Sequence, residues 1–252
     1  MRVATFNILH GRSPADDRVD IDRFAAAVKQ LDADVLALQE VDRNQARSAN
    51  ADLTAVAAEA MGADEHRFVA ALSGSPGATW MAATGEEQPD SAGYGIALLS
   101  RLPVTSWNVV RLASTPTRVP VRFKGSVLPE LVRDEPRVAV AAQVETPRGE
   151  LTVVNTHVSF VGWWGRRQLR TVMRSMERIQ PLLLVGDLNM ELDRAKAITG
   201  MRPLVVHDTF PAHAPREQLD HVLARGDVGT VDSTAVHELP LSDHRALSVD
   251  LT

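Results

Sequence analysis

The chain of 252 residues contains no cysteine. Disulfide bonds, thiolate nucleophiles and zinc–thiolate centres are therefore excluded. No uninterrupted apolar run approaches the ~18–20 residues that a membrane-spanning helix needs. The N-terminus shows no signal peptide, because residues 1–6 already have the composition of a strand. From these absences we expect a cytoplasmic protein without a transmembrane segment.

The chain also lacks any linker-like stretch, low-complexity tract or internal repeat that would divide it. Its hydrophobic content of 44% is sufficient for one large core. Segments with strand patterns outnumber those with helical patterns. We therefore predict a single α/β domain over residues 1–252, and we expect the protein to be a monomer.

Charge is distributed unevenly along the chain. The net charge of -5 argues mildly against a general nucleic-acid-binding protein. Residues 1–100 carry 8 Lys/Arg against 15 Asp/Glu, residues 101–180 carry 13 against 6, and residues 181–252 carry 6 against 11. This pattern predicts either a basic rim around an acidic, cation-binding centre or charges that simply scatter over a solvated surface.

The segment Pro181–Asn189 has the clearest strand signal. Its four consecutive apolar residues are too few for a buried helix and are bounded by proline and glycine, which is typical of a strand buried on both faces. Ligands of α/β sheets collect at the carboxyl ends of such strands. Asp187 and Asn189 should therefore lie at the mouth of a site, although Gly-Asp and Asn are also ordinary turn formers.

The rest of the chain shows further strands, a few amphipathic helices and long loops. Asp20 precedes apolar residues at helical spacing, which is typical of an N-cap. A hairpin turn is expected at 147–149. Helices are predicted over 21–31, 53–61, 166–179 and 191–198, strands over 3–8, 34–40, 94–101, 107–112, 137–144, 151–157, 182–185, 218–223, 230–237 and 244–251, and loops over 9–19, 73–93 and 113–135.

Several predicted strands end in polar side chains. Oxygens of Asp, Glu and Asn suit a hard cation such as Mg²⁺ or Mn²⁺. Two histidines beside carboxylates supply a base and an acid near neutral pH. Together these groups indicate a metal-assisted phosphoryl hydrolase, unless they only satisfy turns and buried backbone groups. The residues are Asn7, Glu40, His157, Asp187, Asn189, Asp220, Asp243 and His244.

Short motifs run in a fixed order along nearly the whole chain, namely Thr5–Asn7, Leu38–Asp42, Tyr94–Gly95 with Leu99–Arg101, Asn155–His157, Gly186–Asn189, Leu219–Asp220 and Ser242–His244. Each is weak alone, but the ordered set resembles the endonuclease/exonuclease/phosphatase superfamily, which has the deoxyribonuclease I fold. The resemblance implies a four-layered α/β sandwich. In this fold two mostly antiparallel sheets pack face to face with helices outside.

The resemblance also implies which residues would hold a divalent metal, Mg²⁺ or Mn²⁺. Glu40 would ligate the ion with help from Asn7. Asp243 would sit near the metal. Asp187 would position the attacking water or bind a second cation.

The same resemblance implies how protons would move at the site. His244 would be the base that takes a proton from the attacking water, and Asp220 would hold the His244 imidazole in the required tautomer. Asn189 would donate to the phosphoryl oxygens in the transition state. His157 would stabilise or protonate the leaving-group side.

One motif departs from the family pattern. Deoxyribonuclease-like members pair the equivalent of His157 with a carboxylate from the strand that here contains Tyr94, and residues 94–96 offer none. The sequence therefore leaves open which group orients His157. His221, adjacent to Asp220 on a strand, should face the opposite way, and we interpret it as structural.

The predicted loop after His157 contains adjacent tryptophans and arginines. The tryptophans could stack on bases, enter a lipid interface or cap the core. The arginines could hold a substrate phosphate, although most arginines of a helix this basic are solvated. Candidate substrate contacts are Tyr94, Arg43, Trp163, Trp164, Arg166 and Arg167, with His10 and Arg47 as further candidates for lining the mouth.

Three kinds of substrate fit these observations. A phosphodiesterase acting on a small or lipid-like phosphoester is favoured, because the overall charge is acidic and the basic region is local. A nuclease for DNA or RNA and a phosphomonoesterase for a small metabolite are the alternatives. Abasic-site endonucleases of the exonuclease III type are disfavoured, because they generally lack the histidine found here at position 157. A binding module with a degraded site is disfavoured by the complete set of acids and histidines.

Overall fold

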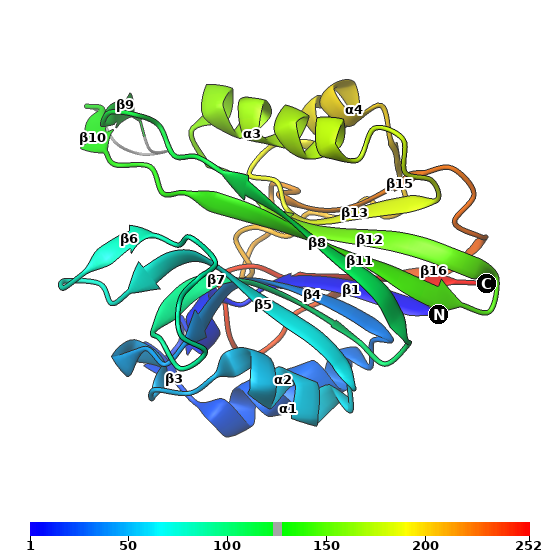
Figure 1. The fold of residues 1–252 in the computed structure, drawn as a ribbon, viewed down its shortest axis with the longest axis horizontal. Coiled ribbons are helices and arrows are strands. Elements are labelled where there is room, and N and C mark those ends of the chain that lie inside the picture. The colour runs from blue at the N-terminus through cyan, green and yellow to red at the C-terminus, as the bar shows by residue number, and fades with distance from the viewer. Residues whose placement is uncertain (123–127) are drawn as a thin grey trace.

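A computed structural model describes residues 1–122 and 128–252. Figure 1 shows four layers, in which helices α1 and α2 lie below a pair of stacked sheets and helices α3 and α4 lie above it. The predicted four-layered α/β sandwich is thereby confirmed. Helices α1 and α2 cover the first sheet, and helices α3 and α4 cover the second. Their bounds are α1 Ile21–Leu31, α2 Leu53–Met61, α3 Gly162–Ser175 and α4 Leu192–Thr199.

The described strands form two large sheets. The first has the order β16-β17-β1-β4-β7-β5-β6, with β16 Val231–His237, β17 Ala246–Leu251, β1 Arg2–Asn7, β4 Val35–Arg43, β7 Gly93–Ser100, β5 Glu65–Gly74 and β6 Trp80–Ala82. The second has the order β14-β15-β13-β12-β11-β8, with β14 Arg202–Pro203, β15 Asp220–Arg225, β13 Leu182–Asp187, β12 Gly149–His157, β11 Arg137–Thr146 and β8 Val104–Leu112. Most pairings are antiparallel, and the β1–β4 and β12–β13 pairs are parallel.

Local sequence signals set the helices of the first layer. The Asp20 side chain accepts a hydrogen bond from the Arg23 amide and caps α1, as predicted. Asp52 caps α2 in the same way, and Gly62 ends this helix with a φ of 70°. The apolar residues of both helices face the first sheet and form one buried cluster with it.

Three apolar layers hold the sandwich together. The middle layer lies between the sheets and contains Val3, Val140, Val153, Leu183 and Val222 among others. A second layer packs α1 and α2 on the first sheet, and a third packs α3 and α4 on the second. The central strand β13 is buried along its whole length, as expected for a strand covered on both faces.

Strand alternation carries polar side chains into the seam between the sheets. Successive side chains of a strand point to opposite faces, so residues two apart share a face. Four predicted site residues lie two positions along their strand from a residue whose side chain is between the sheets. Their side chains therefore also point between the sheets, beyond the apolar part of the middle layer. The pairs are Thr5 and Asn7, Asn155 and His157, Val185 and Asp187, and Val222 and Asp220.

Segments predicted as loops contain short paired strands. Residues 9–19 include the 3₁₀ turn Leu9–Gly11 and the pair β2 Arg12–Ser13 and β3 Arg18–Val19, and residues 73–93 include β6. Residues 113–135 include the pair β9 Val119–Val121 and β10 Glu130–Val132, and positions 123–127 of this segment lie outside the described residues. Pairs of two or three residues leave no periodic pattern in the sequence, which is why the prediction missed them.

Helix α3 begins at Gly162, earlier than the predicted start at 166, and ends at Ser175. Trp163 and Trp164 therefore lie in its first turn and not in a loop. The entry to the helix is fixed by tertiary hydrogen bonds, from the Ser159 amide to Gln168 and from the Trp164 indole to the Ala113 carbonyl. Such distant partners leave no capping signal in the local sequence.

A layer of buried amides connects the two sheets directly beneath the site. The Asn155 amide nitrogen on β12 donates to the carbonyls of Leu38 at 2.9 Å and Ala97 at 2.8 Å, both in the first sheet. Its oxygen accepts from Gln39 at 2.8 Å, and Gln39 in turn contacts Thr5. The layer fixes the position of one sheet relative to the other just where the site begins.

The variant Asn155→Ala is expected to lower the free energy of unfolding by about 2–4 kcal/mol, because it leaves two buried carbonyls and the Gln39 amide without this partner. Urea unfolding followed by circular dichroism measures the loss. Thr152→Ala on the same strand is the control and should cost less than about 1 kcal/mol, because Thr152 is partly exposed. Equal losses in the two variants would contradict this account of the polar layer.

Candidate active site

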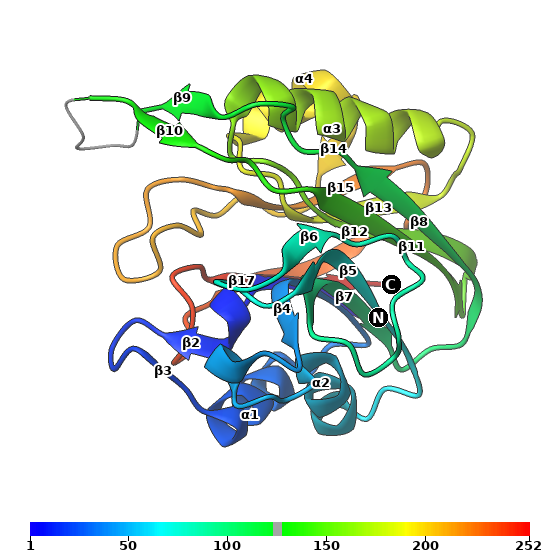
Figure 2. The ribbon, with the colours of Figure 1, turned by 60° about the vertical axis from the view of Figure 1, so that its left-hand side comes forward.

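Strands from both sheets bring their polar ends together at one end of the sandwich, which we call the mouth. Strands β1, β4, β12 and β13 end there, and β15 begins there because it is antiparallel to β13. Figure 2 shows the loops after these strands on the left, on the side away from the chain termini. The mouth thus collects the motif residues that are far apart in the sequence.

His244 and Asp220 form a buried pair. The Nδ1 of His244 lies 2.8 Å from Oδ2 of Asp220, and the ring of Phe210 packs against the imidazole with centroids 4.9 Å apart. The hydrogen bond to Asp220 occupies Nδ1, so Nε2 points into the site, where Oδ2 of Asp187 lies 3.9 Å away. The predicted orientation of His244 by Asp220 is therefore present in the geometry.

Asn7 connects two carboxylates from different sheets. Its Nδ2 donates to Oε1 of Glu40 at 3.1 Å and to Oδ2 of Asp187 at 3.0 Å. Its oxygen accepts from the Leu9 amide at 3.1 Å. The amide therefore holds the two carboxylates side by side and shields part of their mutual repulsion.

Glu40 reaches the site through a β-bulge. The β4–β7 register shifts between Gln39 and Val41, which leaves Glu40 as the extra residue with a φ of 57°. In a regular strand the Glu40 side chain would point to the face opposite Gln39, which is the helix-facing side that Leu38 occupies. The bulge instead releases its side chain at the mouth, at the cost of a left-handed backbone that is rare for glutamate.

Asn189 also has a left-handed backbone, with a φ of 47°. Its backbone N–H donates to Oδ1 of Asp187 at 2.9 Å, and its side-chain Nδ2 donates to the Val158 carbonyl at 3.0 Å. Its Nδ2 lies 3.1 Å from Nε2 of His157. Gly186, the last residue but one of β13, allows this strand to approach β12 closely, because a Cβ there would meet the Thr156 carbonyl oxygen at 2.0 Å.

Arg137 lies beside His157, for which residues 94–96 offer no carboxylate. Its Nη1 lies 3.2 Å from Nδ1 of His157, and the guanidinium is buried. Because arginine can only donate, Nδ1 must accept, and the neutral ring carries its proton on Nε2. Sequence reasoning overlooked Arg137, although a charged residue opening an apolar, alternating strand was an available signal.

Burial shifts the pKa values of the clustered groups. Burial raises the pKa of Glu40, and it raises the pKa of Asp187 to about 7 despite the nearby His244. Burial alone would lower the pKa of His244, but Asp220 outweighs it and raises the pKa to about 10. Burial and the positive charge of Arg137 hold the pKa of His157 well below its usual range, so this ring stays neutral.

Asp243 and the residues predicted to line the mouth occupy its edge. Arg47 forms a bidentate ion pair with Asp42 and lies 5.3 Å from the Tyr94 ring centroid. Burial and the charge of Arg47 lower the pKa of His10 to about 4. The Arg43 guanidinium is engaged with the Ser91 carbonyl and the Phe68 ring. Asp243 is half-buried beside this edge.

A family model described as the Endonuclease/Exonuclease/phosphatase family matches residues 4–244. The chain belongs to this family. Members of the family are phosphoric ester hydrolases, and the chain is an enzyme of this class. A comparison with curated proteins gave no match.

Solved structures of the family share the fold at low identity. One from Bacteroides vulgatus is 22% identical, with a TM-score of 0.68 and coverage of 100% of this chain and 98% of that chain. A mannosyl-6-phosphatase from Bacteroides thetaiotaomicron is 16% identical, with a TM-score of 0.68 and coverage of 100% and 99%. A sphingomyelinase C from Streptomyces griseocarneus is 16% identical, with a TM-score of 0.64 and coverage of 100% and 99%.

The endonuclease/exonuclease/phosphatase family generally uses a divalent metal, and the donor set of this chain fits one. Asp187, Asp220 and His244 offer ligand atoms within 4.8 Å of one another. Oδ1 of Asp220 is buried without a hydrogen-bond partner among the described residues. Burial raises the pKa values of Glu40 and Asp187, and a bound cation would favour the charged form of both carboxylates.

The tryptophans and arginines at the start of α3 contact one another and make no described contact with the His244 cluster. Trp163 and Trp164 pack edge to face with centroids 5.2 Å apart, and the Arg167 guanidinium lies 5.0 Å from the Trp164 ring. Trp163 is exposed, whereas the Trp164 indole donates to the Ala113 carbonyl at 2.7 Å. In this family member Trp164 thus anchors the helix. His221 is structural, as predicted, and contacts the Met190 carbonyl at 2.8 Å.

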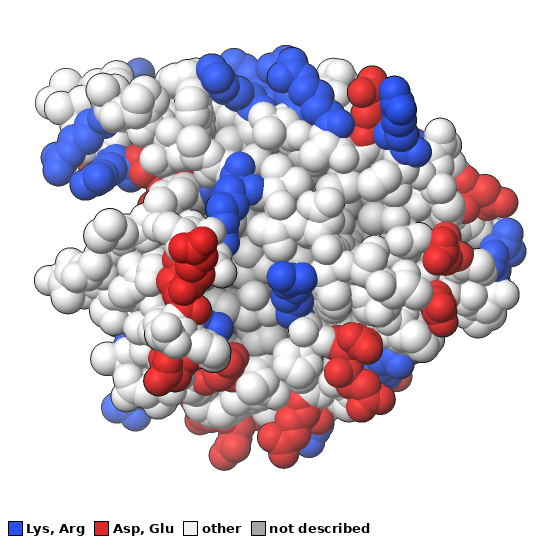
Figure 3. All heavy atoms as spheres, in the orientation of Figure 1, with Lys and Arg blue, Asp and Glu red and all other residues white. Residues whose placement is uncertain are grey.

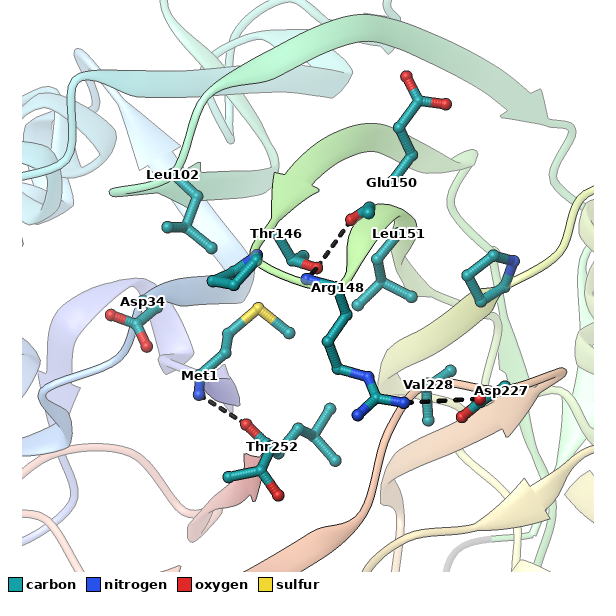
Figure 4. A pocket seen from close by; sticks show the side chains of 14 residues that line it. Met1, Asp34, Leu102, Thr146, Arg148, Glu150, Leu151, Asp227, Val228 and Thr252 are labelled. Carbon is teal, nitrogen blue, oxygen red and sulfur yellow. Dashed lines mark hydrogen bonds and ion pairs between the residues drawn. The ribbon is translucent and has the colours of Figure 1, made fainter.

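Two pockets differ in their relation to the cluster. One of about 450 Å³ lies at the end that holds both chain termini and contains the Arg148–Asp227 ion pair seen in Figure 4. None of the predicted site residues lines it. A second, of about 700 Å³, lies at the mouth beside His244, because Phe210 and Asp243 line it together with prolines and leucines. Asp243 lines the second pocket, whereas His244, Asp187 and Glu40 do not.

The variant Asp187→Asn is expected to stabilise the metal-free protein at pH 8 by about 1–2 kcal/mol. Because burial raises the pKa of Asp187 from 3.8 to about 7, the folded state binds more protons than the unfolded state between these values. The free energy of unfolding of the wild type therefore falls as the pH rises from about 4 to 7. At pH 4 the two proteins should differ little.

Urea unfolding in the presence of a chelator, at both pH values, measures this difference. Asp193→Asn on the exposed surface of α4 is the matched control and should change stability at neither pH. A destabilised Asp187→Asn protein at pH 8 would show that the Asp187 carboxylate is not strained by burial.

Proposed function

We propose that this phosphoester hydrolase is a divalent-metal-dependent phosphodiesterase for small or lipid-like phosphoesters. The observation that carries the proposal is the buried His244–Asp220 pair, whose free Nε2 faces Asp187 at 3.9 Å across the seam of the two sheets. A base held in this way, beside a carboxylate cluster that needs a cation, is the arrangement that activates water against a phosphoester.

Glu40 and Asp187 are the residues that would hold the cation. Their carboxylates lie on either side of the Asn7 amide, and hard oxygen ligands suit Mg²⁺ or Mn²⁺. When bound, the ion would neutralise these carboxylates and the negative charge of the phosphoryl group. Asn7 presents its nitrogen to both carboxylates, so we assign it to positioning them in place of the ligand role expected from the resemblance. The charge of Asp243 also raises the pKa of both Glu40 and His244, so Asp243 would lie near the cation, as the resemblance implies.

His244 takes the proton of the attacking water at Nε2. Asp220 holds Nδ1–H at 2.8 Å, which fixes the tautomer with a free Nε2 and stabilises the imidazolium that forms. Phe210 covers the ring face and excludes bulk water from that side. We therefore interpret the closeness of Asp220 and His244 as a hydrogen-bonded pair and not as two ligands of one ion.

His157 and Asn189 supply donors around the phosphoryl group. Arg137 fixes the proton of His157 on Nε2, 3.6 Å from Oδ2 of Asp187. The low pKa keeps this ring neutral, so His157 stabilises the leaving-group oxygen as a hydrogen-bond donor and does not protonate it as an imidazolium. The Asn189 side-chain nitrogen lies 3.1 Å from this Nε2, on the same side, and donates to the Val158 carbonyl.

The surroundings of the cluster favour a diester with an apolar or small second group. The pocket of about 700 Å³ near His244 combines the apolar residues Pro14, Pro211, Leu239, Pro240 and Leu241 with the polar residues Arg23, His213, Glu238 and Asp243. Among the similar structures one is a sphingomyelinase and another a mannosyl-6-phosphatase. The former is the comparison that supports a lipid-like substrate for this chain.

A nuclease is the second candidate, and the arginines near the mouth are the observation that favours it. Arg118, Arg122 and Arg133 are exposed on the β9–β10 segment, and Figure 3 shows basic side chains along α3 above the second sheet. The affinity of these arginines for a nucleic acid would fall steeply as the salt concentration rises. Turnover of small diesters that is insensitive to salt supports the phosphodiesterase.

The variant His244→Ala is expected to lower kcat by at least about 10²–10⁴-fold, because it removes the base. The assay uses Mg²⁺ or Mn²⁺ with bis-p-nitrophenyl phosphate, p-nitrophenyl phosphate, supercoiled DNA, a phosphocholine lipid and an inositol phosphate. Diesters should be turned over fastest, and a chelator should abolish the activity. His66→Ala, an exposed histidine at the start of β5, is the control and should keep full rate. Full activity of His244→Ala would refute the mechanism, and turnover of DNA alone would favour the nuclease.

The pH profile should report the Asp220–His244 pair. Since Asp220 raises the pKa of His244 to about 10, kcat/KM of the wild type should increase with pH toward about 10 as His244 loses its proton. Asp220→Asn removes that charge, so the rising limb should move to lower pH by about 1 unit or more while the maximal rate falls. Asp193→Asn should leave the profile unchanged. A limb that stays in place in Asp220→Asn would show that His244 is not the titrating base.

A further inference from the structure

The large apolar side chains that the described residues leave exposed all lie at the mouth. They are Met81, Leu128, Leu131, Trp163 and Val206. Strands β7, β11 and β15 run away from the mouth, because they are antiparallel to β4, β12 and β13. Strands β5, β8 and β14 are antiparallel to β7, β11 and β15 and therefore run toward the mouth. Met81 follows β5, Leu128 and Leu131 follow β8, and Val206 follows β14. Trp163 follows β12, which ends there as well. The opposite end, which holds the termini, exposes none of this set.

The β9–β10 pair projects from the body of the protein at the mouth, as both ribbon views show. Leu131 on β10 has 67% of its surface exposed, and Trp163 at the start of α3 has 51%. The base of the projection is fixed to α3, because the Trp164 indole and the Gln168 amide both donate to the Ala113 carbonyl. The exposed leucine and tryptophan are thus carried by two connected elements.

Exposed arginines lie on the same elements as these apolar side chains. Arg118 and Arg133 flank the β9–β10 pair, and Arg167 follows Trp163 in α3. Figure 3 shows mainly basic side chains on the projection and along α3, whereas most acidic side chains lie over the lower layer, and Glu130 on β10 is exposed as well. Apolar tips within a basic field are the composition of a surface that docks on anionic lipid, where tryptophan and leucine enter the headgroup region and arginine meets phosphate.

We propose that this interfacial patch, consisting of Leu131, Trp163, Arg118, Arg133 and Arg167, binds an anionic phospholipid bilayer and holds the mouth at its surface. Among the described residues no helix is long and apolar enough to cross a bilayer, so the contact is peripheral. A nucleic acid would use the arginines but would gain little from an exposed leucine. This binding to lipid does not depend on the proposed hydrolysis, so the vesicle experiment tests it even if the chain does not hydrolyse phosphodiesters.

The test measures co-sedimentation of the full chain with vesicles of phosphatidylcholine alone and of phosphatidylcholine with phosphatidylglycerol. Binding is expected to the anionic vesicles and to weaken with salt. Leu131→Ser and Trp163→Ser should each reduce the partition coefficient at least about fivefold, and Arg133→Glu should reduce it further. Arg148→Glu, at the opposite end, makes the same change in net charge and should leave the partition unchanged. These are exposed positions, and circular dichroism checks that each variant is folded.

Each alternative outcome overturns the proposal. No sedimentation with anionic vesicles at low salt refutes it directly. Equal loss in Arg148→Glu and Arg133→Glu would show a response to net charge only. Retained vesicle binding in both apolar variants would show that Leu131 and Trp163 do not enter the bilayer. Binding to DNA that these variants do not alter, without any binding to vesicles, would assign the arginines to a nucleic acid. Turnover of bis-p-nitrophenyl phosphate without vesicles should be unchanged in Leu131→Ser, which separates docking from catalysis.

Discussion

The crowding of carboxylates in the seam between the two sheets is the constraint on which the rest of the structure depends. Asp187 and Asp220 are buried, Glu40 is half-buried, and like charges in such surroundings repel strongly. The His244 ring offsets the charge of Asp220, and Asn7 bridges the other two. The negative charge that remains is the reason for a cation, so the proposed metal requirement follows from the same burial that shifts the pKa values.

The sandwich sustains this crowding because the surrounding layers are apolar and its inter-sheet contact is fixed. Below the carboxylates lie the amides of Asn155 and Gln39 with the Thr5 hydroxyl, and below these lies the apolar inter-sheet layer. Polarity therefore increases stepwise from the core to the mouth. Buried amides can bond across sheets with defined geometry, whereas apolar contacts alone would let the sheets slide. The position of the proposed catalytic groups thus depends on the layer beneath them.

Strand direction concentrates function at one end. The parallel pairs β1–β4 and β12–β13 place the ends of four strands at the mouth, and the segments that leave the other strands there carry the exposed apolar and basic side chains. The opposite end has both termini and short turns. A substrate and the proposed lipid surface would therefore approach the same face.

Strand alternation by itself determined much of the site. A side chain two residues beyond a buried inter-sheet position must face the same way, so Asn7, His157, Asp187 and Asp220 could be assigned from the sequence, and His221 to the opposite face. The fold class followed from the ordered motifs. Composition excluded thiolate chemistry and pointed to oxygen ligands.

The tertiary structure alone decided the remaining features. The bulge that redirects Glu40 forms against β7, the Arg137 contact that fixes the His157 tautomer joins two neighbouring strands, and Trp164 is held by the distant Ala113 carbonyl. Each of these features depends on a partner residue that the helical or strand periodicity of the local sequence does not predict. Sequence patterns record which face a residue occupies, whereas the partner it meets there is set only when the two sheets and their helices are packed.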